Sequence, residues 1–169
     1  MTEEKEKMFS RVKLKVARII DVKRHPNADK LYVETITLGD EEREIVSGLV
    51  PYYKEEELVG KNIILVANLK PAKLRGVLSN GMLLAAEADG KIEVIFAGDA
   101  VPGERIKIEG TNNTEEERQD DIATDELTIE EFFSVQLKVE DYFLCMEEKK
   151  LLCSKGPIMT TDIKDGKVT

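Results

Sequence analysis

The stretch RVKLKVARIIDVKR, residues 11–24, decides the fold class, because apolar and charged side chains alternate along it as in a half-buried β-strand. The apolar positions of one parity are Val12, Leu14, Val16, Ile20 and Val22. Arg18 interrupts this row. Either the strand bulges near Ala17, as a strand that bends around a small barrel must, or Arg18 emerges at the mouth of a barrel. A long strand of this kind predicts a mainly β fold.

Short strands and turn signals follow as far as residue 110. Strands are predicted over residues 31–38, 43–50, 61–69, 81–88 and 91–97, with a closing strand that ends near residue 108. The stretch YYKEEELVG, residues 52–60, predicts a short helix or turn that ends at Gly60. This order fits a five-stranded OB-fold barrel, although periodicity alone does not separate it from other small barrels.

Three further segments flank this predicted domain of residues 11–110. Residues 1–10 are rich in charge and predict a solvated linker, and residues 111–126 predict a polar, acidic connector. Residues 127–169 are too few to build a core of their own. We therefore expect them to form a small α+β extension that packs on the barrel.

Two features of the extension follow from its residues. Thr128 precedes Glu131 by the spacing of a capping box, which predicts a short helix. The stretch FLCMEEKKLLCS, residues 143–154, predicts a hairpin that turns at residues 147–150 and makes Cys145 and Cys153 diagonal neighbours. Both thiols are expected to be reduced and partly buried in a cytoplasmic chain.

The composition is that of a soluble globular chain. Hydrophobic residues make up 41% of 169, yet no apolar run approaches the roughly 20 residues of a membrane helix. The N-terminus lacks the apolar segment of a secretory signal, so we expect a cytoplasmic protein or an excised fragment of a longer one. Because His25 is the single histidine, no metal site of four nitrogen or sulfur ligands can be assembled, and no metal or cofactor is expected.

The net charge of −9 is distributed unevenly. Residues 1–110 carry a net charge of −1 and residues 111–169 one of −8. Two stretches run the other way: residues 11–24 hold six basic side chains against Asp21, and residues 58–86 hold four against none. Either these side chains only solvate an outer surface, or they form a basic face. A polyanion within a Debye length, about 8–10 Å, responds mainly to such local charge.

Three blocks of sequence, in their order and spacing, resemble a known family. They are RIIDVKRHPNADKLYVE (residues 18–34), IVSGLV (residues 45–50) and NLKPAKLRGVLSNGMLLAA (residues 68–86). They resemble the tRNA-binding domain of the endothelial-monocyte-activating polypeptide II family over residues 11–110. The end of the third block, SNGM, also resembles the related bacterial domains of methionyl- and phenylalanyl-tRNA synthetases.

This resemblance implies an OB-fold that binds tRNA by shape and backbone and assists an aminoacyl-tRNA synthetase. Such domains are appended to synthetases (methionyl-, tyrosyl- or lysyl-tRNA synthetase) or carried by a subunit of a multisynthetase complex. Bacterial versions dimerise, whereas versions with a C-terminal region fold it on the barrel as a mimic of the second subunit and stay monomeric. Residues 127–169 have the length and position of that region.

A signalling role is the alternative that the family offers. Its cytokine-active members carry a motif in the first strand, where this chain has KVARIID, residues 15–21. The stretch departs from the family pattern at Ala17, where glycine is common, and at Asp21, where threonine is common. An enzyme is not predicted, because no constellation of nucleophile, base or metal ligands is found in the chain. A catalytic synthetase domain upstream remains an expectation for a longer parent, with methionyl-tRNA synthetase as the first guess.

Lys70, Lys73 and Arg75 are the predicted phosphate contacts, on a loop that Pro71 stiffens and Gly76 lets turn. We call residues 68–82 the basic loop. Arg18 and Lys15 would extend its patch if their side chains point outward.

Polar neighbours of these cations are also candidates for tRNA binding. Asn68, Ser79 and Asn80 can offer hydrogen bonds to RNA, and for Asn68 and Ser79 the competing role is to tie down the backbone of the loop. His25 is expected either to stabilise its turn or to face RNA. Tyr32, Tyr52 and Tyr53 could stack on bases, and the sequence does not show which are exposed.

Overall fold

The computed structural model describes residues 2–110 and 126–169 and is mainly β. The predicted connector of residues 111–126 therefore lies outside the described residues except for Glu126. Among the described residues, no helix is both long and apolar enough to cross a membrane.

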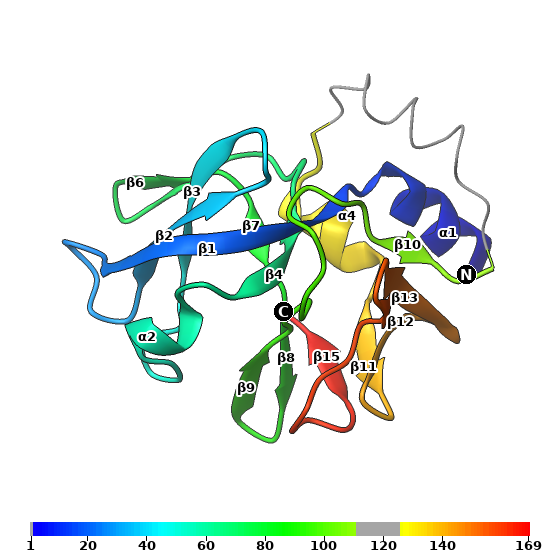
Figure 1. Cartoon of the computed structure of the whole chain (residues 1–169). Helices are drawn as coiled ribbons and strands as arrows, with labels where there is room; N and C mark the ends of the chain where they lie inside the picture. The colour runs from blue at the N-terminus through cyan, green and yellow to red at the C-terminus, as the bar shows by residue number, and fades with distance from the viewer. Residues whose placement is uncertain (1, 111–125) are drawn as a thin grey trace.

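Five strands form a curled antiparallel sheet in the order β3–β2–β1–β4–β7, which we call the first sheet (Figure 1). They are β1 (Leu14–Arg24), β2 (Tyr32–Thr37), β3 (Glu42–Ser47), β4 (Asn62–Val66) and β7 (Met82–Leu83). The predicted hairpin at the acidic turn is confirmed by the pairing of β2 with β3. The short helix predicted before Gly60 is α2 (Glu55–Leu58). A separate two-stranded hairpin joins β5 (Ala72–Leu74) to β6 (Val77–Ser79).

The central strand β1 is buried on both faces, which its alternation did not predict. Leu14 and Val16 belong to one buried cluster, whereas Ala17 and Ile19 belong to another, inside the first sheet. The register with β2 shifts between Ile19 and Asp21, so the bulge comes later than the position near Ala17 suggested by the sequence. A bulge adds one residue and reverses the parity. Val22 therefore lies in the inner cluster, and Ile20 is exposed.

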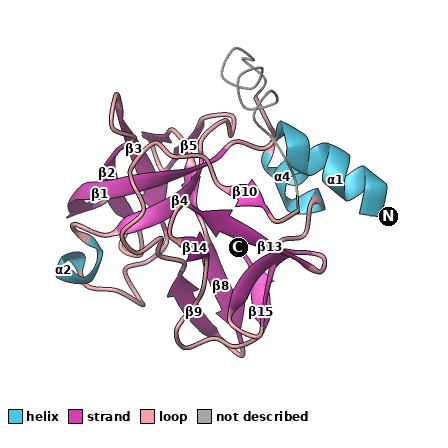
Figure 2. Cartoon of the chain, turned by 45° about the vertical axis from the view of Figure 1, so that its right-hand side comes forward, coloured by secondary structure: helices cyan, strands magenta, loops and turns pink. Residues whose placement is uncertain are grey.

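The second sheet joins strands from both halves of the chain (Figure 2). Its main path is β10–β13–β12–β11–β15–β8–β9, and β14 pairs with β13. The strands before residue 110 are β8 (Ala85–Ala88), β9 (Lys91–Val94) and β10 (Lys107–Ile108). Those of the extension are β11 (Lys138–Glu140), β12 (Phe143–Met146), β13 (Lys149–Cys153), β14 (Gly156–Pro157) and β15 (Gly166–Val168). The single strand predicted at residues 81–88 is divided at Leu84, with β7 in one sheet and β8 in the other.

The extension is tied to the rest of the chain by strand pairing and by a shared core. β15 pairs with β8, and β13 pairs with β10. One cluster of buried side chains, which we call the interface cluster, contains Leu14, Val16 and Ile64 from the first sheet together with Phe132 and Leu144 from the extension. The helix predicted from the capping box is confirmed as α4 (Ile129–Ser134), whose cap is formed by Thr128 and Glu131.

Glu93 on β9 adds a polar latch between the two halves. Its carboxylate accepts hydrogen bonds from Thr161 N and Oγ1 at 2.7 and 3.0 Å, from Asp162 N at 3.1 Å and from Ile163 N at 2.8 Å. Burial alone would raise the pKa of Glu93, but these hydrogen bonds outweigh it and hold the pKa below its ordinary value. The charged form of Glu93 is therefore the form that holds the extension.

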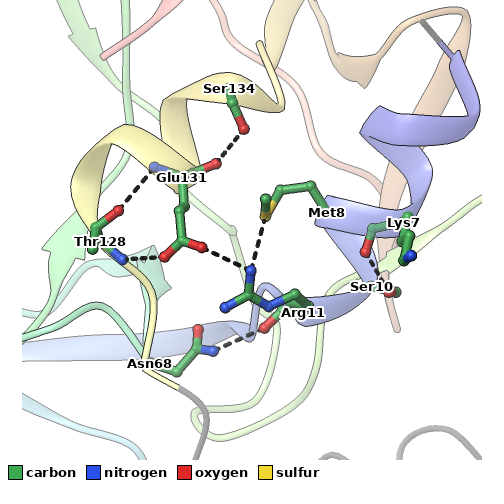
Figure 3. A network of polar contacts seen from close by, with 8 residues as sticks. All are labelled: Lys7, Met8, Ser10, Arg11, Asn68, Thr128, Glu131 and Ser134. Carbon is green, nitrogen blue, oxygen red and sulfur yellow. Dashed lines mark hydrogen bonds and ion pairs between the residues drawn. The ribbon is translucent and has the colours of Figure 1, made fainter.

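The N-terminus differs from the solvated linker predicted for residues 1–10, because residues 2–11 form helix α1 (Thr2–Arg11). Met8 and Phe9 pack against the interface cluster. Arg11 Nη1 lies 2.8 Å from Glu131 Oε2 on α4, beside Met8 (Figure 3). Acidic residues in the first turn and Arg11 in the last also complement the helix dipole. The charged segment is thus held as a helix by residues that lie more than 100 positions away in the sequence, such as Glu131.

The cysteines also differ from the prediction. Cys145 pairs with Lys150 and Met146 with Lys149, so the hairpin turns at residues 147–148, more tightly than expected. This register separates Cys145 and Cys153 along the strands, and they are not diagonal neighbours. Both thiols are free, Cys145 buried and Cys153 half-buried.

Candidate nucleic-acid interface

The β5–β6 hairpin presents the cations of the basic loop. Leu74 pairs with Val77 across a two-residue turn, in which Arg75 has φ 53° and Gly76 has φ 92°. Positive φ at both turn positions is the geometry of a type I′ hairpin, which glycine adopts without strain. The side chains of Lys70, Lys73 and Arg75 are exposed. Within the described residues none of the three forms an ion pair, so their charges are available to an anion.

The first stem of the basic loop is held by Asn68. Its Oδ1 accepts a hydrogen bond from Lys13 N at 2.9 Å, and its Nδ2 donates to Arg11 O at 2.8 Å (Figure 3). The backbone on either side exchanges hydrogen bonds with Leu127 of the extension, from Leu127 N to Asn68 O and from Lys70 N to Leu127 O. Asn68 therefore fixes backbone, which is the competing role recognised in the sequence.

The second stem is held against β3. Ser79 is buried, and its Oγ accepts from Val46 N at 2.9 Å and donates to Gly81 O at 3.0 Å. Asn80 N donates to Glu44 O, while the side chain of Asn80 is half-buried and makes no hydrogen bond within the described residues. Among the described residues, the side chain of Asn80 is therefore available to hydrogen-bond a ligand, whereas the side chains of Asn68 and Ser79 are hydrogen-bonded to backbone groups.

His25 ties the tip of the hairpin to the turn after β1. It is 5% exposed; its Nδ1 accepts from Asn27 N at 2.9 Å, and its Nε2 lies 2.8 Å from Leu74 O. A ring nitrogen that accepts is unprotonated, so Nε2 carries the proton and donates to the carbonyl. The imidazole is thus buried and stabilises the turn.

Lys15 and Arg18 lie in different places. Arg18 is exposed and pairs with Asn62 at the start of β4, where its Nε donates to Asn62 Oδ1 at 3.1 Å. The basic loop begins after the opposite end of β4. The guanidinium of Arg18 is thus bound to the start of β4, while the tip of the β5–β6 hairpin lies against the turn that follows β1. Lys15 is half-buried and pairs with Leu65, nearer the loop, and its charge contributes to the low pKa of Glu41.

Arg43 on β3 is a residue that the sequence analysis missed. Its Nη1 donates to Ala67 O at 2.6 Å and to Asn80 O at 3.5 Å. Its Nε and Nη2 donate to the two carboxylate oxygens of Glu41, at 3.1 and 3.2 Å. The hydrogen bond from Arg43 is the largest influence on Glu41, whose pKa lies below its ordinary value. The available signal was a single basic residue within the acidic run at residues 40–44.

Aromatic and acidic groups near the interface are mostly enclosed. Tyr32 Oη donates to Tyr53 O at 2.7 Å, and Tyr53 Oη accepts from Val94 N, so Tyr52 is the exposed member of the three tyrosines. Glu34 is fully buried, with Oε2 accepting from Ser47 Oγ at 2.6 Å and Oε1 without a hydrogen-bond partner among the described residues. Burial raises the pKa of Glu34 to about 8, which keeps it protonated at neutral pH.

No group of three or more side chains that could hold a metal ion occurs among residues 2–110 and 126–169. Among the described residues, the candidate interface is a set of exposed cations without ion pairs, on a basic loop whose two stems and hairpin tip are hydrogen-bonded to neighbouring elements.

Comparison with known proteins places this geometry in a family. A family model described as a putative tRNA-binding domain matches residues 14–105. The methionine-tRNA ligase of Treponema denticola is 41% identical over 173 residues, covering 94% of this chain and 21% of the ligase. The chain therefore spans about a fifth of the length of this relative.

Solved structures extend the likeness to three dimensions. The C-terminal domain of Plasmodium vivax p43 superposes with a TM-score of 0.84 at 31% identity, covering 95% of this chain and 98% of that one. A methionyl-tRNA-synthetase-related protein from Pyrococcus horikoshii covers 59% of this chain and 94% of its own, with 36% identity and a TM-score of 0.57. The family model, the sequence relative and the p43 domain agree, and the chain belongs to the family of putative tRNA-binding domains.

Proposed function

We propose that this chain is a non-catalytic tRNA-binding module that is appended to an aminoacyl-tRNA synthetase, with methionyl-tRNA synthetase as the first candidate. The family membership supports tRNA as the ligand. The ligase relative, of which the chain covers about a fifth, supports the synthetase as the partner. In this role the chain raises the local concentration of tRNA near the catalytic domain and leaves the chemistry to that domain.

The observation that carries the proposal is the set of exposed cations on the basic loop. Lys70, Lys73 and Arg75 lie within six positions and have no acidic partner within the described residues. RNA phosphates are spaced regularly along a backbone, and a lysine or arginine that neutralises one of them releases counterions. We propose that the curled first sheet is the core of a five-stranded OB-fold barrel, and RNA shape is recognised through such phosphate contacts.

The extension fits the proposal as a substitute for a second subunit. Its strands pair with β8 and β10, and its apolar side chains fill the interface cluster against the first sheet. The face that would otherwise need a second copy is thereby covered, so we propose that the chain is monomeric. The protein from Pyrococcus horikoshii covers 59% of this chain.

The salt dependence of tRNA binding tests the site. In the triple variant of Lys70, Lys73 and Arg75 to alanine, we expect weaker binding and a slope of log K against log salt that is smaller by up to about 3. The matched control removes three exposed lysines elsewhere, at Lys91, Lys155 and Lys164. Equal slopes for the triple variant and the unmodified chain would refute the assignment of the site.

A further inference from the structure

The side chain of Arg43, on β3, links the two ends of the basic loop to the turn before β3. The guanidinium contacts Ala67 O and Asn80 O on one side and both carboxylate oxygens of Glu41 on the other. Its side chain is 17% exposed. With Nε, Nη1 and Nη2 all engaged, Arg43 is a half-buried connector and not a free cation on the patch.

The two carbonyls that Arg43 contacts lie at the two stems of the basic loop. Ala67 immediately precedes the loop, and Asn80 lies near its end. Between them stands a hairpin of two three-residue strands, which belongs to neither large sheet. An isolated hairpin of this size is marginally stable in water, so its position depends on what holds the stems. One guanidinium that binds both stems fixes where the loop leaves and re-enters the first sheet.

Glu41 sets the orientation of this guanidinium. The two parallel hydrogen bonds between Arg43 and Glu41 form a planar fork, which lysine cannot reproduce because its ammonium has no fixed donor geometry. With the plane held by Glu41, Nη1 is directed at the loop carbonyls. We call Glu41, Arg43 and the carbonyls of Ala67 and Asn80 the Arg43 clamp.

We propose that Arg43 is a positioning residue for tRNA binding, which holds the basic loop closed through Ala67 and Asn80 in an orientation set by Glu41. The proposal rests on the proposed function. It assigns to Arg43 no contact with RNA. The effect on affinity arises because a ligand that binds only one arrangement of a loop loses affinity in proportion to the population of that arrangement.

Two variants with a matched control separate positioning from simple electrostatics. Arg43→Lys keeps the positive charge but loses the planar fork. We expect tRNA affinity to fall about fivefold, as it would if the loop occupied its binding arrangement about a fifth of the time.

Glu41→Ala removes a negative charge near the patch. Charge alone predicts tighter binding of tRNA, whereas the clamp predicts weaker binding. Glu42→Ala, at the exposed neighbour, makes the same change in charge without touching the clamp. Binding by Glu41→Ala as tight as by Glu42→Ala would overturn the proposal.

A double-mutant cycle excludes a direct contact between Arg43 and RNA. When Lys70, Lys73 and Arg75 are already alanine, Arg43→Lys should have no further effect on tRNA affinity, because the loop it positions has lost its cations. If Arg43→Lys still lowers tRNA affinity about fivefold in the variant that lacks the three cations, the proposal is overturned.

Amide hydrogen exchange gives a readout that needs no RNA. In the free protein, Arg43→Lys should speed exchange at residues 72–79 at least several-fold more than in β1 and β4, and uniform or unchanged exchange contradicts the clamp. If instead the triple alanine variant binds tRNA as the unmodified chain does, the proposed site fails, while the exchange result still decides whether Arg43 positions the hairpin.

Discussion

Replacing Glu93 with glutamine removes the charge from the latch between β9 and the extension while preserving the shape of the side chain. The carboxylate accepts four hydrogen bonds from Thr161, Asp162 and Ile163. Glutamine offers one accepting oxygen and directs an NH₂ group at the remaining donors. Each buried donor left without an acceptor costs about 1–3 kcal/mol. We therefore expect the free energy of unfolding to fall by about 3 kcal/mol, and Tm by about 6–12 °C for a chain of this length.

Urea unfolding followed by circular dichroism measures this change, and Glu140→Gln is the control. Glu140 forms an exposed ion pair with Lys138 at 2.7 Å. Surface pairs contribute about 0–1 kcal/mol, so the control should be nearly neutral. A loss below about 0.5 kcal/mol for Glu93→Gln, within the range of ordinary surface substitutions, would refute the reasoning.

The pH dependence of the same variant has a definite sign. The pKa of Glu93 is lowered in the folded protein, so its contribution to stability is fully present above the ordinary glutamate pKa and is lost as pH falls through the lowered value. The difference between the unmodified chain and Glu93→Gln should accordingly be constant at neutral pH and shrink below about pH 4.

Three other substitutions have distinct expected outcomes. Glu34→Gln should flatten a fall in stability of up to about 1.4 kcal/mol per pH unit. In the unmodified chain the free energy of unfolding falls with pH between the ordinary glutamate pKa of 4.5 and the raised pKa of Glu34, about 8. Urea unfolding at several pH values in that range measures the fall, and the same dependence on pH in Glu34→Gln would contradict the burial argument. Gly76→Ala, at φ 92°, should cost about 1–2 kcal/mol, seen as faster amide exchange in β5 and β6, and equal exchange rates would exclude the strain. Asn68→Ala should lower the unfolding free energy by about 1–3 kcal/mol, measured by urea unfolding, and a loss below about 0.5 kcal/mol would contradict its role in holding the backbone.

Local patterns were sufficient to predict β1 to β4, β9 and the turn between β2 and β3, but not the strands of the β5–β6 hairpin or the division of residues 81–88 between two sheets. Alternation in residues 11–24, the acidic turn before β3 and the capping box at Thr128 each act within a few positions of the residues they organise. The exposed cations of the hairpin were also predictable, because Gly76 and Pro71 mark a turn that holds them out of the core.

Contacts between distant segments explain what the sequence could not show. In residues 1–10 only Met8 and Phe9 are suitable for packing near the end of the helix, and their partners include residues of the extension. Arg43 resembled a solvated charge in an acidic turn, and only the approach of Ala67 and Asn80 makes it a connector. Arg18 shared a basic stretch with Lys15, and only the pairing of β1 with β4 shows that its guanidinium is bound to Asn62.

Burial of β1 on both faces makes this strand a wall common to two hydrophobic interiors. Val16 and Ala17 are adjacent and both have no exposed area, yet they face opposite interiors. If β1 detached from one hydrophobic cluster, it would also leave the other and expose apolar side chains of both. The two clusters should therefore unfold in one cooperative transition. A deletion or insertion of one residue within β1 would turn every following side chain of the strand to the opposite face, so that each interior would be lined by the side chains that now line the other. For that reason β1 is the segment of the molecule least able to change in length.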